Sequence, residues 1–122
     1  MGIAAAAWAL LRHDRATPEQ SALLDGERVV VEVLNGSGRR GLARTATREL
    51  RKVGFDVSYF GTRGDSLPVT LVLARRGDSN AAARVARALG VGQVRVRTDT
   101  LLRVDVTVML GADYRPPAVL HP

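Results

Sequence analysis

The residues best suited to chemistry lie in one glycine-rich segment. An apolar run from Val29 to Leu34 stops at an Asn-Gly pair, and a turn then leads into a helical pattern. The first turn of a helix leaves backbone N–H groups unpaired and carries a partial positive charge, so such a turn can hold an anion. The candidate residues for binding a phosphate or carboxylate are Asn35, Gly36, Ser37, Gly38, Arg39, Arg40 and Gly41.

Two other interpretations of this turn stay open. Gly36, Gly38 and Gly41 have the G-x-G-x-x-G spacing of dinucleotide-binding turns. The next strand, however, ends in Tyr59, Phe60 and Gly61 where a ribose-binding acid would be needed, which disfavours a dinucleotide. The structural interpretation is that the glycines allow positive φ angles and close backbone approach in a sharp strand-to-helix turn.

Side chains for catalysis or metal binding are scarce. The two histidines, His13 and His121, lie in terminal segments, and Ser37 has no partner base near it in the sequence. The aspartates lack the spacing of an acid–base or metal pair, and cysteine is absent. The sequence therefore predicts no catalytic residue, no metal site and no cofactor.

The chain is strongly basic. It has 18 basic and 12 acidic residues, giving a net charge of +6, and Lys52 is the one lysine. Such charge attracts nucleic acid, phosphate-bearing wall polymers or an anionic membrane, although a GC-rich coding sequence would give the same bias. The arginines at positions 40, 44, 48 and 51 share one helical face, which could follow a polyanion or could be solvated.

Nucleic acid is the less favoured polyanion. The predicted order of strands and helices also occurs in RNA recognition modules, whose central strands carry aromatic side chains that stack on bases. Here the equivalent runs, Val29–Leu34 and Val69–Ala74, contain no aromatic residue. Tyr59 and Phe60 lie on a different strand, so we do not expect nucleic-acid binding.

Periodicity predicts five strands and two helices in an α/β domain. The linker Gly61–Pro68 is too short for a crossover helix, which excludes a plain doubly wound sheet. We therefore predict a two-layer sandwich of split strand-helix-strand units (βαββαββ), with two helices on one face of a mixed sheet. The predicted strands are Arg28–Leu34, Phe55–Phe60, Val69–Ala74, Val94–Arg97 and Val104–Leu110, and the predicted helices are Gly41–Val53 and Ser79–Leu89.

Three details of this prediction can be checked. Alternation in the second strand places Phe55, Val57 and Tyr59 on one side. Either Asp78 or Ser79 caps the second helix. If the last strand lies parallel beside the first, Asp113 and Tyr114 approach the glycine-rich turn.

The chain divides into three parts. Residues 1–26 form an apolar segment and linker, residues 27–115 the folded domain, and residues 116–122 a flexible tail. The apolar stretch Gly2–Leu11 is about half the length that spans a bilayer. We favour the remnant of a membrane anchor that starts upstream; an alanine-rich helix packed on the domain, or an interfacial segment with Trp8 at the membrane boundary, are the alternatives.

Three segments carry a resemblance to a known family: VEVLNGSGRRGLA (31–43), TLVLAR (70–75) and VDVTVMLGADY (104–114). They resemble the C-terminal domain of the LytR/CpsA/Psr cell-envelope proteins, over roughly Arg28 to Tyr114. The resemblance implies an extracytoplasmic, envelope-associated and non-catalytic domain, which we expect to be anchored to the membrane. The phosphotransferase domain of the larger family members has no counterpart in this sequence, so their activity is not transferred.

We thus expect a binding or interaction module of the cell envelope, whose partner is an anionic wall polymer or peptidoglycan. Two alternatives remain open. One is a soluble domain that binds phosphate or a nucleotide, and the other is a scaffold with a protein partner in an envelope complex.

Overall fold

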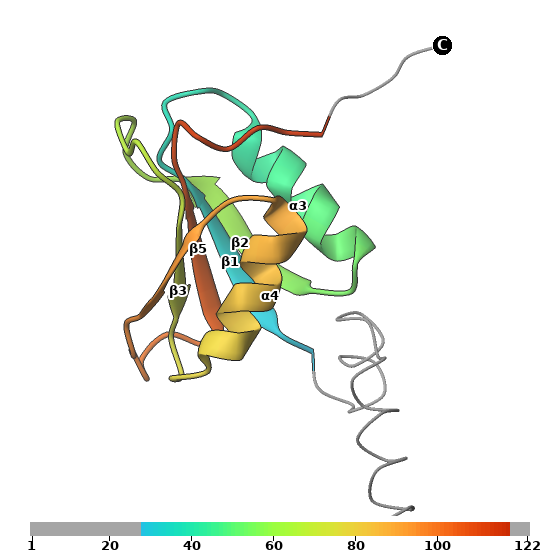
Figure 1. Ribbon diagram of the computed structural model, residues 1–122, viewed down its shortest axis with the longest axis vertical. Coiled ribbons are helices and arrows are strands. Elements are labelled where there is room, and N and C mark those ends of the chain that lie inside the picture. The colour runs from blue at the N-terminus through green and yellow to red at the C-terminus, as the bar shows by residue number, and fades with distance from the viewer. Residues whose placement is uncertain (1–27, 118–122) are drawn as a thin grey trace, which may run out of the picture.

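Residues 28–117 are described by the computed structural model, and they form a five-stranded mixed sheet with two helices on one face (Figure 1). This confirms the predicted fold class, and every predicted boundary falls within two residues of the observed one. The elements in chain order are β1 (Val30–Asn35), α3 (Leu42–Lys52), β2 (Asp56–Thr62), β3 (Leu71–Ala74), α4 (Ser79–Leu89), β4 (Gln93–Val96) and β5 (Val106–Leu110).

The sheet joins two parallel strand-helix-strand units around a central strand. The strand order is β2-β1-β5-β3-β4. The unit β1-α3-β2 and the unit β3-α4-β4 each pair their strands in parallel, while β5 lies between them, parallel to β1 and antiparallel to β3. As a result, the segment that follows β5 emerges at the same edge of the sheet as the glycine-rich turn that follows β1.

The core lies between the sheet and the helices. Small residues on the inner helix faces let both helices pack close to the sheet, and each fully buried valine or leucine contributes roughly 1.5–3 kcal/mol. Asp78 is the N-cap of helix α4, because its Oδ1 accepts a hydrogen bond from the Ala81 N–H at 3.1 Å. The fully buried core residues include Val31, Val33, Ala46, Leu50, Val72, Ala82, Val85, Val106, Val108 and Leu110.

The prediction that Tyr59 shares a face with Phe55 and Val57 is wrong. Val57 pairs with Val31, but the next residue of β1, Glu32, pairs with Tyr59, so Ser58 is an extra residue in β2. Such a β-bulge breaks the alternation of side chains between the two faces. Phe55 and Val57 remain buried against the helices, whereas Tyr59 turns to the helix-free face and is 57% exposed.

The predictions for residues 1–26 and for most of the C-terminal tail lie outside the described residues. Within 28–117, neither helix is long and apolar enough to cross a bilayer. The proposed membrane attachment therefore concerns a part of the chain whose structure is not described.

Candidate functional site

The glycine-rich turn, Asn35 to Gly41, is closed by its own side chains. Asn35 ends β1 and is buried, and its Nδ2 donates to the Arg39 carbonyl at 2.7 Å. Asn35 Oδ1 accepts from the N–H and the hydroxyl of Ser37, at 3.0 and 2.6 Å. Ser37 Oγ in turn accepts from the Arg39 N–H at 3.0 Å. The N–H groups of Ser37 and Arg39 are thus satisfied within the turn.

The glycines of the turn meet different constraints. A Cβ on Gly36 would lie 3.2 Å from the carbonyl oxygens of Arg63 and Leu110. Gly38 has a φ of +83°, and its Cβ would lie 2.5 Å from the Asp65 carbonyl oxygen. Gly41 has a φ of +82° but open space where its Cβ would be. Close carbonyl oxygens therefore explain why glycine stands at positions 36 and 38, and at position 41 the positive φ angle alone favours glycine.

The two arginines of the turn have different surroundings. Arg39 Nη2 donates to the carbonyl oxygens of Ala112 and Tyr114, at 3.1 and 2.6 Å. These bonds tie the segment after β5 to the turn, which confirms that Tyr114 approaches it. Asp113 instead accepts from the Thr70 N–H and hydroxyl, at 2.8 and 2.7 Å. Arg40 is exposed, and its side chain forms no hydrogen bond within residues 28–117. Of the two guanidinium groups, that of Arg40 is therefore the one free to bind a ligand.

Helix α3 begins at this turn with its positive end unneutralised by side chains. Gly41 is the N-cap and offers no side chain to accept from the first N–H groups, and no acidic residue lies in the first turn. Of the residues that the sequence predicts to bind an anion, Asn35, Ser37 and Arg39 build the turn, and Arg40 lies beside the uncapped start of α3. The described residues contain no cluster of three metal-ligating side chains.

Tyr114, beside this turn, is a core residue that sequence periodicity did not single out. It is 1% exposed, and within the described part of the chain its hydroxyl has no hydrogen-bond partner. Burial raises the pKa of the Tyr114 hydroxyl, and the negative charge of Glu49 raises it further. The phenol thus stays protonated at neutral pH, and the side chain packs in the hydrophobic core.

Basic side chains continue along both helices from the turn. On α3, Arg44, Arg48 and Arg51 are exposed, and the single acid, Glu49, pairs with Lys52 at 3.2 Å. Helix α4 packs beside α3 and carries two arginines and no acid (Figure 1). We call this set the basic helical layer: Arg44, Arg48, Arg51, Lys52, Arg84 and Arg87. The sequence predicted the α3 stripe but not its extension onto α4, because that extension depends on helix packing.

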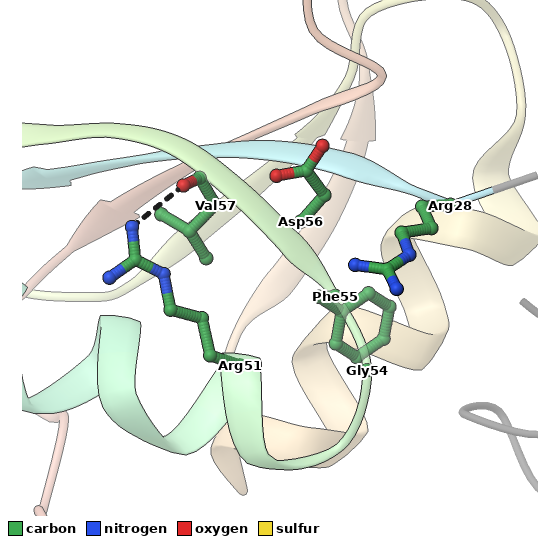
Figure 2. Close-up of a pocket in the computed structure, with 6 residues that line it drawn as sticks. All are labelled: Arg28, Arg51, Gly54, Phe55, Asp56 and Val57. Carbon is green, nitrogen blue, oxygen red and sulfur yellow. Dashed lines mark hydrogen bonds between the residues drawn. The ribbon is translucent and has the colours of Figure 1, made fainter. Parts of the chain in front are cut away.

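A pocket of about 280 Å³ lies at the opposite end of β1 and β2 (Figure 2). The C-terminal end of α3 and the start of β2 form most of its wall, and Arg51 Nη2 donates to the Val57 carbonyl at 2.9 Å across it. No sequence motif marks this pocket, since it joins short segments that are separated along the chain. Its lining residues are Arg28, Arg51, Gly54, Phe55, Asp56 and Val57.

These features define a small two-layer α/β domain whose helical layer is basic and whose glycine-rich turn anchors the segment after the last strand. The chain belongs to the LytR_C family, described as LytR cell envelope-related transcriptional attenuator, whose model matches residues 28–114. This confirms the resemblance seen in the sequence and relates the domain to cell-envelope proteins.

A solved structure titled "Solution Structure of the C-terminal domain of RV0431" is 33% identical to this chain. The match covers 69% of this chain and 72% of that one, with a TM-score of 0.43. No curated protein matches the chain.

Proposed function

We propose that this domain is a non-catalytic, extracytoplasmic binding module that attaches to an anionic polymer of the cell wall. The basic helical layer is the observation that carries the proposal, because it sets six basic residues against one acid, and that acid is paired with Lys52. Phosphate or carboxylate groups repeated along a polymer would meet several guanidinium groups at once. Arginine suits this role since its planar group can donate two parallel hydrogen bonds to one anion.

The glycine-rich turn forms one end of the proposed binding surface. Arg40 precedes α3 and continues the line of Arg44 and Arg48 at helical spacing. The uncapped first turn of α3 adds a partial positive charge next to Arg40. In this proposal Arg40 and the start of α3 hold one anionic group, and Arg39 positions the turn through its bonds to the C-terminal segment.

The proposal also assigns residues 1–26, with their apolar stretch, to membrane attachment. A tethered domain would meet wall polymers close to the membrane, which raises the local concentration of both partners. Comparing the localisation of the full-length protein with that of a variant lacking residues 2–11 tests this assignment. Release of that variant from the membrane fraction is the expected result, and retention would contradict it.

Co-sedimentation of the full chain with purified wall sacculi tests polymer binding. We expect sedimentation with sacculi that retain their anionic polymers, a loss after those polymers are removed, and weakening as salt screens the charges. The double variant Arg44→Ala and Arg48→Ala should sediment much less.

The matched control is Arg63→Ala with Arg103→Ala, which removes the same charge from exposed positions outside the helices. Equal losses in the two double variants would mean that net charge alone drives binding and would refute the assigned surface. Sedimentation that ignores the anionic polymers would refute the polymer as ligand. If nothing sediments, cross-linking in cells should be used to search for the protein partner of the scaffold alternative.

A further inference from the structure

The two outer strands of the sheet differ in how their edges are protected. Within the described residues, β2 and β4 each pair with a neighbour on one side only. On β4, the outward carbonyl oxygens of Val94 and Val96 accept hydrogen bonds from the side chains of Arg95 and Arg97, at 3.0 and 3.3 Å. Charged side chains placed in this way hinder pairing with another strand. The β4 edge is therefore closed by its own arginines.

The β2 edge, in contrast, has free backbone groups. The Arg63 N–H donates to the Asn35 carbonyl of β1 at 2.9 Å, and the direction of backbone groups alternates along a strand, so Phe60 and Thr62 point outward. Their N–H and C=O groups have no hydrogen-bond partner within residues 28–117. Both side chains are exposed as well. An extended segment can therefore pair with β2 at these two residues.

Arginines of α3 line the helix side of this edge. Arg51 Nη2 donates to the outward Val57 carbonyl at 2.9 Å, which places this side of α3 over the outer edge of β2 (Figure 2). Arg48 and Arg44 precede Arg51 at helical spacing and lie on the same side of the helix, and both are exposed. Asp56, the one acid of β2, points to the helix-free face. The helix side of the edge is therefore positively charged.

We propose that β2 binds an extended acidic segment of a partner protein, which adds to the sheet as a further strand. In antiparallel addition, residues of the segment face Phe60 and Thr62 and exchange backbone hydrogen bonds with them. Facing residues share a face of the sheet, so acidic side chains at these positions meet Arg44 and Arg48. The alternate residues lie beside Tyr59, which is 57% exposed on the helix-free face, and are apolar. The partner segment thus alternates acidic and apolar residues.

Charge favours this partner over a second copy of the chain. When two β2 edges pair antiparallel, the two-fold axis is perpendicular to the sheet, so the helices of both copies lie on one side. The α3 arginines of the two copies would then face each other and repel, whereas an acidic strand attracts them. The inference shares Arg44 and Arg48 with the polymer proposal, but it also requires the free backbone of β2.

Amide hydrogen exchange of the 15N-labelled full chain, measured by NMR, tests the proposal. The probe is a blocked peptide of alternating glutamate and valine, about as long as β2. We expect slower exchange of the Phe60 and Thr62 amides when the peptide is added, because their N–H groups gain acceptors. The same peptide N-methylated at its glutamates keeps its charge but loses the donors that face β2, so it should bind about tenfold more weakly.

Two pairs of variants locate the site. Thr62→Pro removes an outward N–H at an edge, where proline is tolerated, and should weaken peptide binding about tenfold, whereas Thr62→Ala should bind like the wild type. Arg48→Ala should weaken peptide binding, while Arg87→Ala, which removes the same charge from an exposed position of α4, should not. Thr62→Pro should leave binding to sacculi unchanged, so failure of this site and failure of the polymer proposal are distinguishable.

Four results would overturn the proposal. Absence of peptide binding is the first, and binding without slower exchange of the Phe60 and Thr62 amides, which indicates attraction to charge alone, is the second. Equal affinity of the N-methylated peptide would refute strand pairing even if Thr62→Pro does not fold. Slow exchange of both amides in the free chain, together with a dimer in sedimentation velocity, would assign the edge to a second copy instead.

Discussion

Two constraints act on the glycines of the glycine-rich turn: a positive φ angle and the lack of space for a Cβ. Single alanine variants of Gly38 and Gly41 distinguish between them. Both glycines have nearly the same positive φ, +83° and +82°. Alanine in the left-handed region costs about 1 kcal/mol, so this cost is common to both variants. The difference between them then reports the surroundings of the added methyl group.

Those surroundings differ sharply. The methyl group at position 38 would lie 2.5 Å from the Asp65 carbonyl oxygen, whereas at position 41 it meets no atom within 4 Å. Because the obstacle at position 38 is backbone, the loop after β2 must move, which adds about 1–3 kcal/mol. We therefore expect losses of about 1 kcal/mol for Gly41→Ala and about 2–4 kcal/mol for Gly38→Ala.

Thermal and urea unfolding followed by circular dichroism measures both losses. For a domain of this size each kcal/mol lowers the melting temperature by about 4–8 °C, so the two variants are readily resolved. Equal destabilisation would refute the inferred contact with Asp65. Gly41→Ala also tests ligand binding, because its methyl group would enter open space beside the uncapped start of α3, where the proposal places an anion. Polymer binding that falls in this variant while the fold persists would support the proposed anion site.

Three further predictions concern single side chains. Arg39→Ala should lower the free energy of unfolding by about 1–2 kcal/mol, since two carbonyls lose their donor, while Arg40→Ala should change it by less than about 0.5 kcal/mol. Urea unfolding of both variants checks this, and equal losses would contradict it. Tyr114→Phe removes an unpartnered buried hydroxyl, so it should leave stability equal or raise it by up to about 1 kcal/mol. Folding raises the pKa of Tyr114 above the ordinary tyrosine value of about 10. The contribution of the buried phenol to the free energy of unfolding is therefore complete below that pH and is lost as the pH rises above it. Urea midpoints taken from neutral to alkaline pH should therefore fall less in Tyr114→Phe than in the wild type, and parallel curves would contradict this. Asp78→Ala should cost about 1 kcal/mol through loss of the α4 cap, measurable as a lower melting temperature, and an unchanged melting temperature would contradict the capping bond.

Much of the fold could be predicted because each element has a strong local signal. The apolar run before Asn35 predicted a central strand, and β1 has neighbours on both sides. Alternating valines predicted β5, and its inward residues Val106, Val108 and Leu110 are fully buried. The short linker between β2 and β3 excluded a doubly wound sheet, as the observed strand order bears out.

The errors and omissions concern features that depend on pairing between distant segments. The Ser58 bulge follows from the register of β2 against β1, which alternation within β2 alone does not contain. The sequence predicted the approach of Tyr114 to the turn only on the condition that β5 lies beside β1, and it did not identify Arg39, 75 positions away, as the residue that makes the contact. Thr107 is a polar residue of β5, and the sequence does not show that it is fully buried and bonded to the Glu32 and Arg75 side chains, which lie far from it along the chain.

The glycine-rich turn illustrates how one sequence motif divides between structure and proposed function. Its internal bonds use the donors of Asn35, Ser37 and Arg39, which leaves those groups little capacity to bind a ligand. The same bonds fix the point where α3 begins, and with it the direction of Arg40 and of the helix that follows. A rigid turn at this point loses less entropy when a polymer binds than a flexible loop would. The motif therefore serves the proposed binding by orienting the basic helical layer, even where its own residues do not touch the polymer.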